Sequence, residues 1–195
     1  MTTKIDIRRL QDVNELAKAG AETVADHLHQ LTGVETEMQI TKINVIDVDD
    51  LGTHLGADRL VGVNVPLTEP PHGSVLILFD DDSAKTLAHS MLGGVSGDGP
   101  GYSEMERSAI REVGNIMTSG FIDGWANVLG RTIDISTPQL LRAGGEDIVE
   151  HCVDPGEHEI AMVFDSTLEA PDVDVEATIY TFPDIDAFVD LINSM

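Results

Sequence analysis

Four polar residues recur at helical spacing along one stretch of the chain: Ser108, Glu112, Asn115 and Ser119 follow at i, i+4, i+7 and i+11. This spacing places them on one face of a helix. A carboxylate accepts hydrogen bonds, whereas an asparagine amide both donates and accepts them, which suits Asn115 to hold a water molecule. A polar row is also the usual appearance of a solvated helix face, and the spacing alone favours that simpler interpretation.

Three details of the sequence shift the balance towards a functional site. Gly114 stands between Glu112 and Asn115, where a helix interior favours alanine by about 0.5–1 kcal/mol. A glycine there lets another backbone or a ligand come close. Asparagine is also a poor helix former, so local helix propensity does not explain why Asn115 stands at this position. Finally, Pro138 follows Asn115 after a further 22 residues.

The element that positions these residues is a long helix predicted over Ser103–Leu129. Ser103 and Glu106 have the spacing of a capping box. Apolar residues recur at steps of three and four and predict a wide buried face: Met105, Ala109, Val113, Ile116, Met117, Phe121, Trp125, Val128 and Leu129. Gly120 and Gly124, one turn apart, predict close packing against a second long helix.

The pattern Ser108-x3-Glu112-x2-Asn115-x22-Pro138 resembles the signature of the CheC/CheX/FliY family of chemotaxis phosphatases. In that family an Asp or Ser is followed by Glu and Asn at this spacing, and by a proline some 21–22 residues later. The surrounding Glu-Val-Gly-Asn-Ile-Met is also similar to CheC. Within the family the CheC branch fits best, because the resemblance covers nearly the whole chain.

The resemblance implies a hydrolase that dephosphorylates the phosphorylated response regulator CheY. Asn115 would hold the attacking water, and Glu112 would pair with a lysine at the edge of the partner's site. Ser108, Gly114 and Pro138 would support the site or contact the partner, with Gly114 letting the helix enter the partner's pocket. The Mg²⁺ ion is expected on CheY, so we expect no metal or cofactor in this chain.

A different class of function stays open, because CheC-like proteins are associated with two roles. The alternative is a non-catalytic chemotaxis adaptor that binds CheD or other chemotaxis proteins. Glu112 together with Asn115 favours the enzyme. A flagellar-switch role resembling that of FliY is not favoured, because the chain has no extra switch-protein domain.

The order of predicted elements repeats within the chain. The first half is predicted as helix Leu10–Leu31, strand Met38–Val48, loop Asp49–Asp58, strands Leu60–Val65 and Ser74–Phe79, helix Asp82–Leu92 and a linker Gly93–Gly101. The second half is predicted as the long helix, strand Thr132–Ile135, an irregular stretch around Ile148–Val153, strands Glu159–Phe164 and Val173–Phe182, and helix Pro183–Met195. We therefore expect one α+β domain of two pseudo-two-fold repeats, about 1–97 and 98–195, with a shared sheet and two long helices on one face.

Aligning Gly33 with Gly130 superposes the halves with an offset of 97 residues. Equivalent positions are then Gln11 and Ser108, Glu15 and Glu112, Lys18 and Asn115, and Thr41 and Pro138. A lysine has three donors and no acceptor, so it cannot replace a neutral amide. The first half therefore carries a degenerate site, and Glu15 is interpreted as a surface residue.

The charge composition points to high salt. The chain has 35 acidic and 11 basic residues, for a net charge of −24. Nucleic-acid binding is disfavoured, because it needs clustered Lys and Arg. Molar salt shortens the Debye length to about 3 Å and suppresses the self-repulsion. With one cysteine, Cys152, no long apolar run and no signal-peptide pattern, we expect a cytoplasmic protein of a halophile that binds no membrane.

Overall fold

The computed structural model describes residues 10–33, 35–94, 101–153, 160–170 and 173–193. The first half contains α1 (Leu10–Thr32), β1 (Glu37–Asp47), α2 (Val48–Leu55), β2 (Leu60–Pro66), β3 (Ser74–Asp80) and α3 (Asp81–Met91). The second half repeats this order with α4 (Glu104–Leu129), β4 (Gln139–Ala143), α5 (Gly145–Cys152), β5 (Ile160–Ala170), β6 (Val173–Phe182) and α6 (Ile185–Asn193).

The six strands form one antiparallel sheet in the order β1-β5-β6-β3-β2-β4. Exchanging the two halves leaves this order unchanged, because β3 and β6 pair at the centre and β1 and β4 form the edges. The predicted α+β fold with internal pseudo-two-fold symmetry is therefore confirmed. The predicted boundary between the repeats, at residues 97 and 98, lies outside the described residues.

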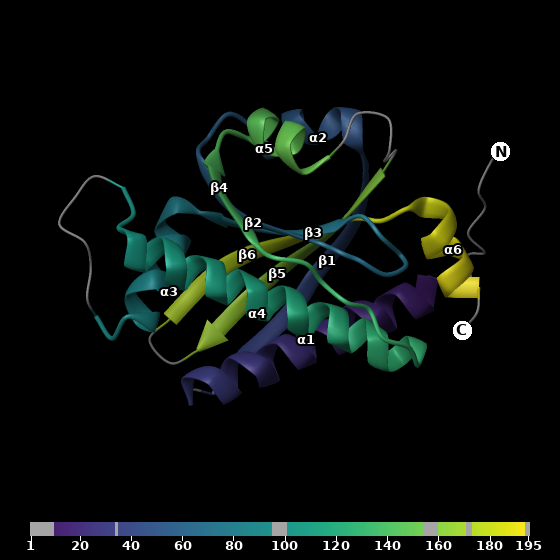
Figure 1. Ribbon diagram of the computed structural model, residues 1–195, viewed down its shortest axis with the longest axis horizontal. Coiled ribbons are helices and arrows are strands. Elements are labelled where there is room, and N and C mark those ends of the chain that lie inside the picture. The colour runs from purple at the N-terminus through teal and green to yellow at the C-terminus, as the bar shows by residue number, and fades with distance from the viewer. Residues whose placement is uncertain (1–9, 34, 95–100, 154–159, 171–172, 194–195) are drawn as a thin grey trace.

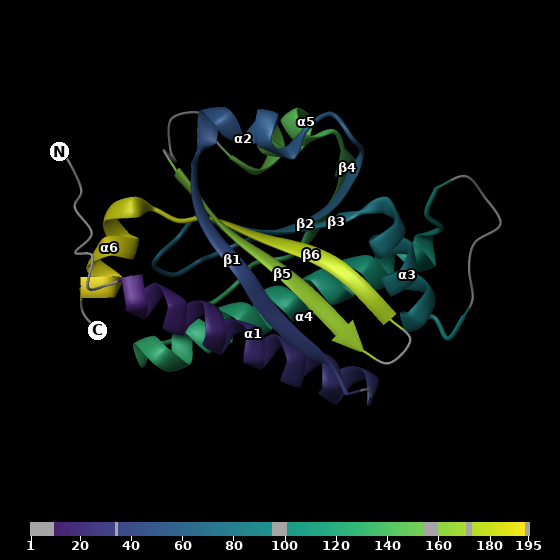
Figure 2. The same ribbon diagram turned by 180° about the vertical axis from the view of Figure 1, so that it is seen from behind.

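Helices cover both faces of the sheet (Figures 1 and 2). The long helices α1 and α4 lie side by side on one face, as predicted, and the short helices α2 and α5 lie on the other. Strand β3 contributes alternate side chains to the two hydrophobic cores, one on each face of the sheet. Its Val75, Ile77 and Phe79 belong to the core under the long helices, whereas Leu76 and Leu78 belong to the core under α2 and α5.

The long helix α4 begins and ends as its sequence predicts. Ser103 Oγ accepts a hydrogen bond from the Glu106 amide, and Glu106 Oε2 accepts one from the Ser103 amide, at 3.2 and 2.7 Å. Gly130 ends the helix in the left-handed conformation, with φ of 63°. One prediction for the buried face is wrong, because the Met105 side chain is 62% exposed. Met105 lies in the first turn, and the buried apolar side chains of α4 start only at Ala109.

Glycines bring α1 and α4 into close contact, as predicted. A Cβ added to Gly124 would lie 2.5 Å from the Ala19 carbonyl, and one added to Gly120 would lie 2.7 Å from the Val24 Cα. Both obstacles are backbone atoms. The two long helices can therefore pack at this distance only because glycine has no side chain.

Two helices, α2 and α5, are absent from the sequence-based prediction, and one predicted strand lies elsewhere. Residues 49–58 were predicted as a loop and 148–153 as irregular, but α2 and α5 occupy most of these segments. Leu51 and Ile148 are fully buried there, so tertiary packing supports helices that local composition does not favour. In place of the predicted strand Thr132–Ile135 there is an isolated bridge between Leu67 and Ile135, and the strand β4 starts four residues later.

Candidate functional site

The predicted polar row lies on the face of α4 that points away from the sheet. Ser108 and Glu112 are exposed, and Asn115 and Ser119 are half-buried. Their spacing makes Glu112 a helical neighbour of both Ser108 and Asn115. The structure thus presents a carboxylate and a neutral amide together at the surface, from one rigid helix.

Gly114 faces the opposite way. It is buried, and a Cβ added to it would lie 2.4 Å from the Val63 Cβ on β2. The glycine is therefore required by the approach of α4 to the chain's own sheet. The expectation that Gly114 lets the helix enter a partner's pocket is corrected by this contact, since a residue packed on β2 is not available to a partner.

The segment that carries Pro138 is held on both sides. Before the proline, the Ser136 amide donates to the Pro66 carbonyl and the Thr68 amide donates to the Asp134 carbonyl, at 2.8 and 2.9 Å. After it, β4 pairs with β2. Pro138 itself is half-buried. Its predicted role in supporting the site stays a prediction.

A polar cluster ties the start of α4 to its neighbours. Arg142 on β4 donates two hydrogen bonds to the Asp81 carboxylate, at 2.9 and 3.0 Å, and Lys85 pairs with the same group at 2.9 Å. The Tyr102 hydroxyl donates to the Asp81 carboxylate at 3.2 Å and lies under Arg142, whose guanidinium carbon is 5.0 Å from the ring centroid. This cluster fixes the entry to α4 against α3 and the sheet edge.

The charges in this cluster oppose the effect of burial on Asp81. Burial acts to raise the pKa of the Asp81 carboxyl, but hydrogen bonds from Lys85 and Arg142 outweigh it and hold that pKa below its usual value. The pKa of Tyr102 is raised, first by burial and then by the Asp81 charge. Asp81 therefore stays ionised and keeps Arg142 in place.

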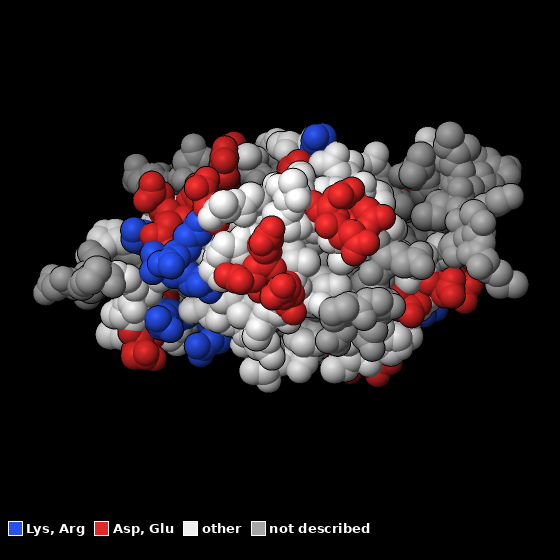
Figure 3. Space-filling model, turned by 90° about the horizontal axis from the view of Figure 1, so that it is seen from above, with Lys and Arg blue, Asp and Glu red and all other residues white. Residues whose placement is uncertain are grey.

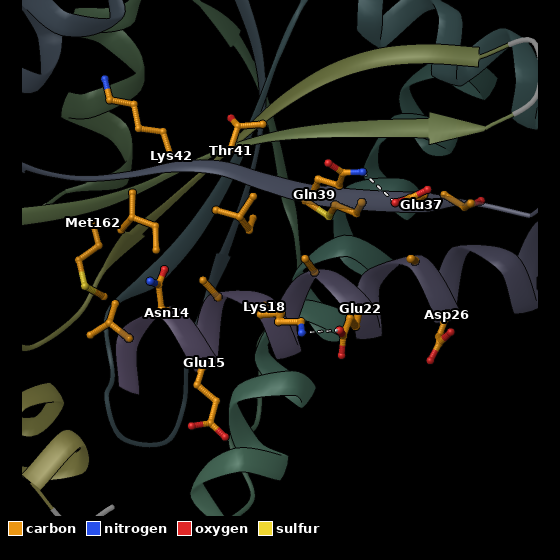
Figure 4. A pocket seen from close by; sticks show the side chains of 18 of the residues that line it. Asn14, Glu15, Lys18, Glu22, Asp26, Glu37, Gln39, Thr41, Lys42 and Met162 are labelled. Carbon is orange, nitrogen blue, oxygen red and sulfur yellow. Dashed lines mark hydrogen bonds and ion pairs between the residues drawn. The ribbon is translucent and has the colours of Figure 1, made fainter. Parts of the chain in front are cut away.

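The equivalent region of the first half lines a groove. A groove of about 1220 Å³ lies between α1 and β1, and Glu15, Lys18 and Thr41 are among the residues that line it. Figure 4 shows Glu15 pointing away from β1, whereas Asn14 points towards the strand side. Lys18 pairs with Glu22 at 3.7 Å, and both side chains are largely exposed. No amide stands beside Glu15 at the position equivalent to Asn115.

Candidate metal ligands do not come together in the described part of the chain. No group of three or more His, Cys, Asp or Glu side chains there could hold a metal ion. His27 instead lies 3.9 Å from Asp123, between α1 and α4. Burial raises the pKa of the Cys152 thiol to about 12, which disfavours a reactive thiolate. Among the described helices, none combines the length and apolar character needed to cross a bilayer.

Sequence reasoning missed one feature of the site, a pair of arginines beside the polar row. Arg107 and Arg111 are exposed on α4 and continue to Asn115 in steps of four residues. The same helical spacing that revealed Ser108 and Glu112 predicts this second row, so the signal was present in the sequence.

Comparison with known proteins identifies the family to which this stretch of the chain is similar. The model of the CheC-like family matches residues 105–142, which contain the polar row and Pro138. A relative from Halobacterium salinarum, named "Putative CheY-P phosphatase CheC1", is 75% identical over 195 residues, with the whole of both chains covered.

Solved structures share the fold at low identity. The crystal structure of Thermotoga maritima FliY has a TM-score of 0.80 at 17% identity and covers 98% of both chains. CheX in a Borrelia burgdorferi CheX–CheY–BeF3–Mg complex has a TM-score of 0.52 at 20% identity, covering 84% of this chain and 95% of the other. The fold, the motif on α4 and the full-length relative agree, and the chain belongs to the CheC-like family.

Proposed function

We propose that this protein dephosphorylates a phosphorylated response regulator of the CheY type. The observation that carries the proposal is the Glu112–Asn115 pair on the exposed face of α4, in a chain whose 75% identical relative is named for CheY-P phosphatase activity. The solved complex of a CheX with CheY shows that a protein of this fold binds such a regulator.

The substrate is an aspartyl phosphate, which already hydrolyses slowly without help. Catalysis therefore requires little beyond a positioned water and stabilised charge. The Asn115 amide can accept a hydrogen bond from the water and donate another to it or to the phosphoryl group. Water attacks phosphorus, the bond to the aspartyl oxygen breaks, and inorganic phosphate and the free carboxylate are released.

Glu112 has a separate role in the proposal. Its carboxylate lies on α4 beside Asn115. An ion pair between this carboxylate and a cation at the edge of the partner's site would therefore anchor α4 next to the phosphoryl group. The Mg²⁺ ion belongs to the partner. The chain supplies orientation, and its rigid capped helix is suited to that task.

A second candidate is a non-catalytic adaptor that binds CheD or other chemotaxis proteins. The observation that favours it is the first half, where Lys18 replaces the amide and a groove lies between α1 and β1. Binding without turnover would use this surface and leave Glu112 and Asn115 without a catalytic role.

Turnover separates the two candidates. Phosphate release from phosphorylated CheY is measured in molar KCl with the protein at substoichiometric concentration. An enzyme accelerates the decay of the whole regulator pool through many cycles. An adaptor leaves the rate unchanged or slows it, and that result would reject the proposed phosphatase.

A further inference from the structure

The two arginines of α4 lie beside the proposed catalytic amide. Arg107, Arg111 and Asn115 follow at steps of four residues, so each is the helical neighbour of the next. Glu112 and Ser108 form the adjoining row on the other side of Asn115. A group held at Asn115 is therefore within the reach of the Arg111 side chain.

Arg111 is not engaged elsewhere in the described part of the chain. The other arginines of this region have partners there: Arg142 pairs with Asp81, and Arg107 Nε donates to the Tyr102 carbonyl at 3.4 Å. No hydrogen bond or ion pair occupies the Arg111 guanidinium among the described residues, although the chain holds 35 carboxylates. Its donors remain available to an incoming anion.

The charge distribution singles out the same region. Figure 3 shows most of the visible Lys and Arg side chains gathered at the end of the molecule that carries α3 and the start of α4. Lys85 and Arg142 belong to this end, but Asp81 offsets their charge. Arg107 and Arg111 lie in the first turns of α4, and no ion pair engages either of them among the described residues.

The first half has neither the two arginines nor the amide of the Glu112–Asn115 pair. At the same offset of 97 residues, Leu10 and Asn14 stand in place of Arg107 and Arg111, and Lys18 stands in place of Asn115. The arginines thus occur on the helix that keeps its amide and not on the helix that has lost it. A purely structural role in helix α1 or α4 would not require this pairing.

We propose that Arg111 binds the phosphoryl oxygens of the partner's acyl phosphate and so selects the phosphorylated form of the regulator. A planar guanidinium matches phosphoryl oxygens, and its charge-assisted hydrogen bonds are stronger than those between neutral groups. Direct hydrogen bonds also persist in molar salt, where long-range attraction is screened. This assignment rests on the proposed phosphatase function and adds to it the residue that recognises the phosphoryl charge.

The test compares binding to CheY with and without beryllofluoride and Mg²⁺, in molar KCl, and phosphate release by the same proteins. Arg111→Ala should weaken binding of beryllofluoride-loaded CheY by about 10-fold and change binding of unloaded CheY less than about twofold. Arg111→Lys should fall between Arg111→Ala and the parent, because an ammonium keeps the charge without the bidentate geometry. The matched control is Arg131→Ala, an exposed arginine just beyond the other end of α4, which should behave as the parent.

The outcomes separate this inference from the function on which it rests. If the parent turns over CheY phosphate but Arg111→Ala keeps the full preference for loaded CheY, the role of Arg111 is wrong and the phosphatase proposal stands. An equal loss of affinity for loaded and unloaded CheY would also overturn it, since that marks a general docking contact. A parent with neither turnover nor preference overturns both.

Discussion

α1 and α4 occupy equivalent places under the sheet, yet they present different surfaces. On α4 a carboxylate, an amide and two arginines share the exposed side at the end of the helix next to α3. On α1 the equivalent row has Lys18 paired with Glu22, beside a groove against β1. The shared fold is maintained by buried glycines and apolar residues, whereas the chemistry depends on a few exposed side chains that can change without disturbing it.

The largest effect is expected where the two halves depend on each other. Gly124→Val would place a branched side chain 2.5 Å from the α1 backbone, which cannot move aside locally. We expect a loss of about 3 kcal/mol or more in the free energy of unfolding, measured by denaturant titration, with both halves unfolding in one transition. Gly52→Ala is the control, because the side chain of Glu146, at 3.2 Å, can shift. Separate unfolding transitions for the two halves would contradict the claim that the halves depend on each other for stability.

The second prediction concerns the two equivalent glutamates. Glu112→Ala should weaken binding to phosphorylated CheY on the order of 10-fold or more, and phosphate release should fall with it, because the anchor to the partner is lost. Glu15→Ala should leave both unchanged. Melting temperatures close to the parent's are expected for both surface variants. A large loss of activity in Glu15→Ala would show that the first half holds a working site.

Salt should affect both halves alike. With a net charge of −24, self-repulsion opposes folding in dilute buffer and is screened in molar KCl. Thermal melts followed by circular dichroism should show a melting temperature that rises with KCl, by about 2–4 °C for each kcal/mol gained. A melting temperature that stays flat across the titration would be inconsistent with a fold adapted to salt.

The smallest effect is expected at the polar cluster, which joins Asp81 and Lys85 of the first half to Tyr102 and Arg142 of the second. The first-half position equivalent to Arg142 holds the exposed Val45. Because the Asp81 pKa is lowered on folding, its contribution is present above the unfolded pKa and is lost as pH falls through the folded one. Asp81→Asn should cost about 1 kcal/mol or less near neutral pH, and less in acid. Asp82→Asn controls for the first-turn charge of α3. A deficit that stays constant into acid would argue against the ion pair.

Much of this could be predicted from sequence because the signals are local. The capping box of Ser103 and Glu106 and the apolar run of β3 define their elements without help from distant residues. α2 and α5 could not be predicted, because each depends on the other: a Cβ on Gly145 would lie 2.5 Å from the Leu55 Cβ. Likewise, sequence placed Gly114 beside the site, but only the packing of α4 on Val63 shows that it faces inward.

Phosphate release by Asn115→Ala and Lys18→Ala, in molar KCl with phosphorylated CheY, tests the central claim most directly. These variants change equivalent positions of the two halves, and alanine favours the helix in both. Asn115→Ala should still bind phosphorylated CheY but release phosphate on the order of 10²-fold more slowly, because the positioned amide is lost. Lys18→Ala should match the parent. If Asn115→Ala releases phosphate as fast as the parent, the proposed catalytic role of α4 is wrong and the non-catalytic adaptor function is favoured instead.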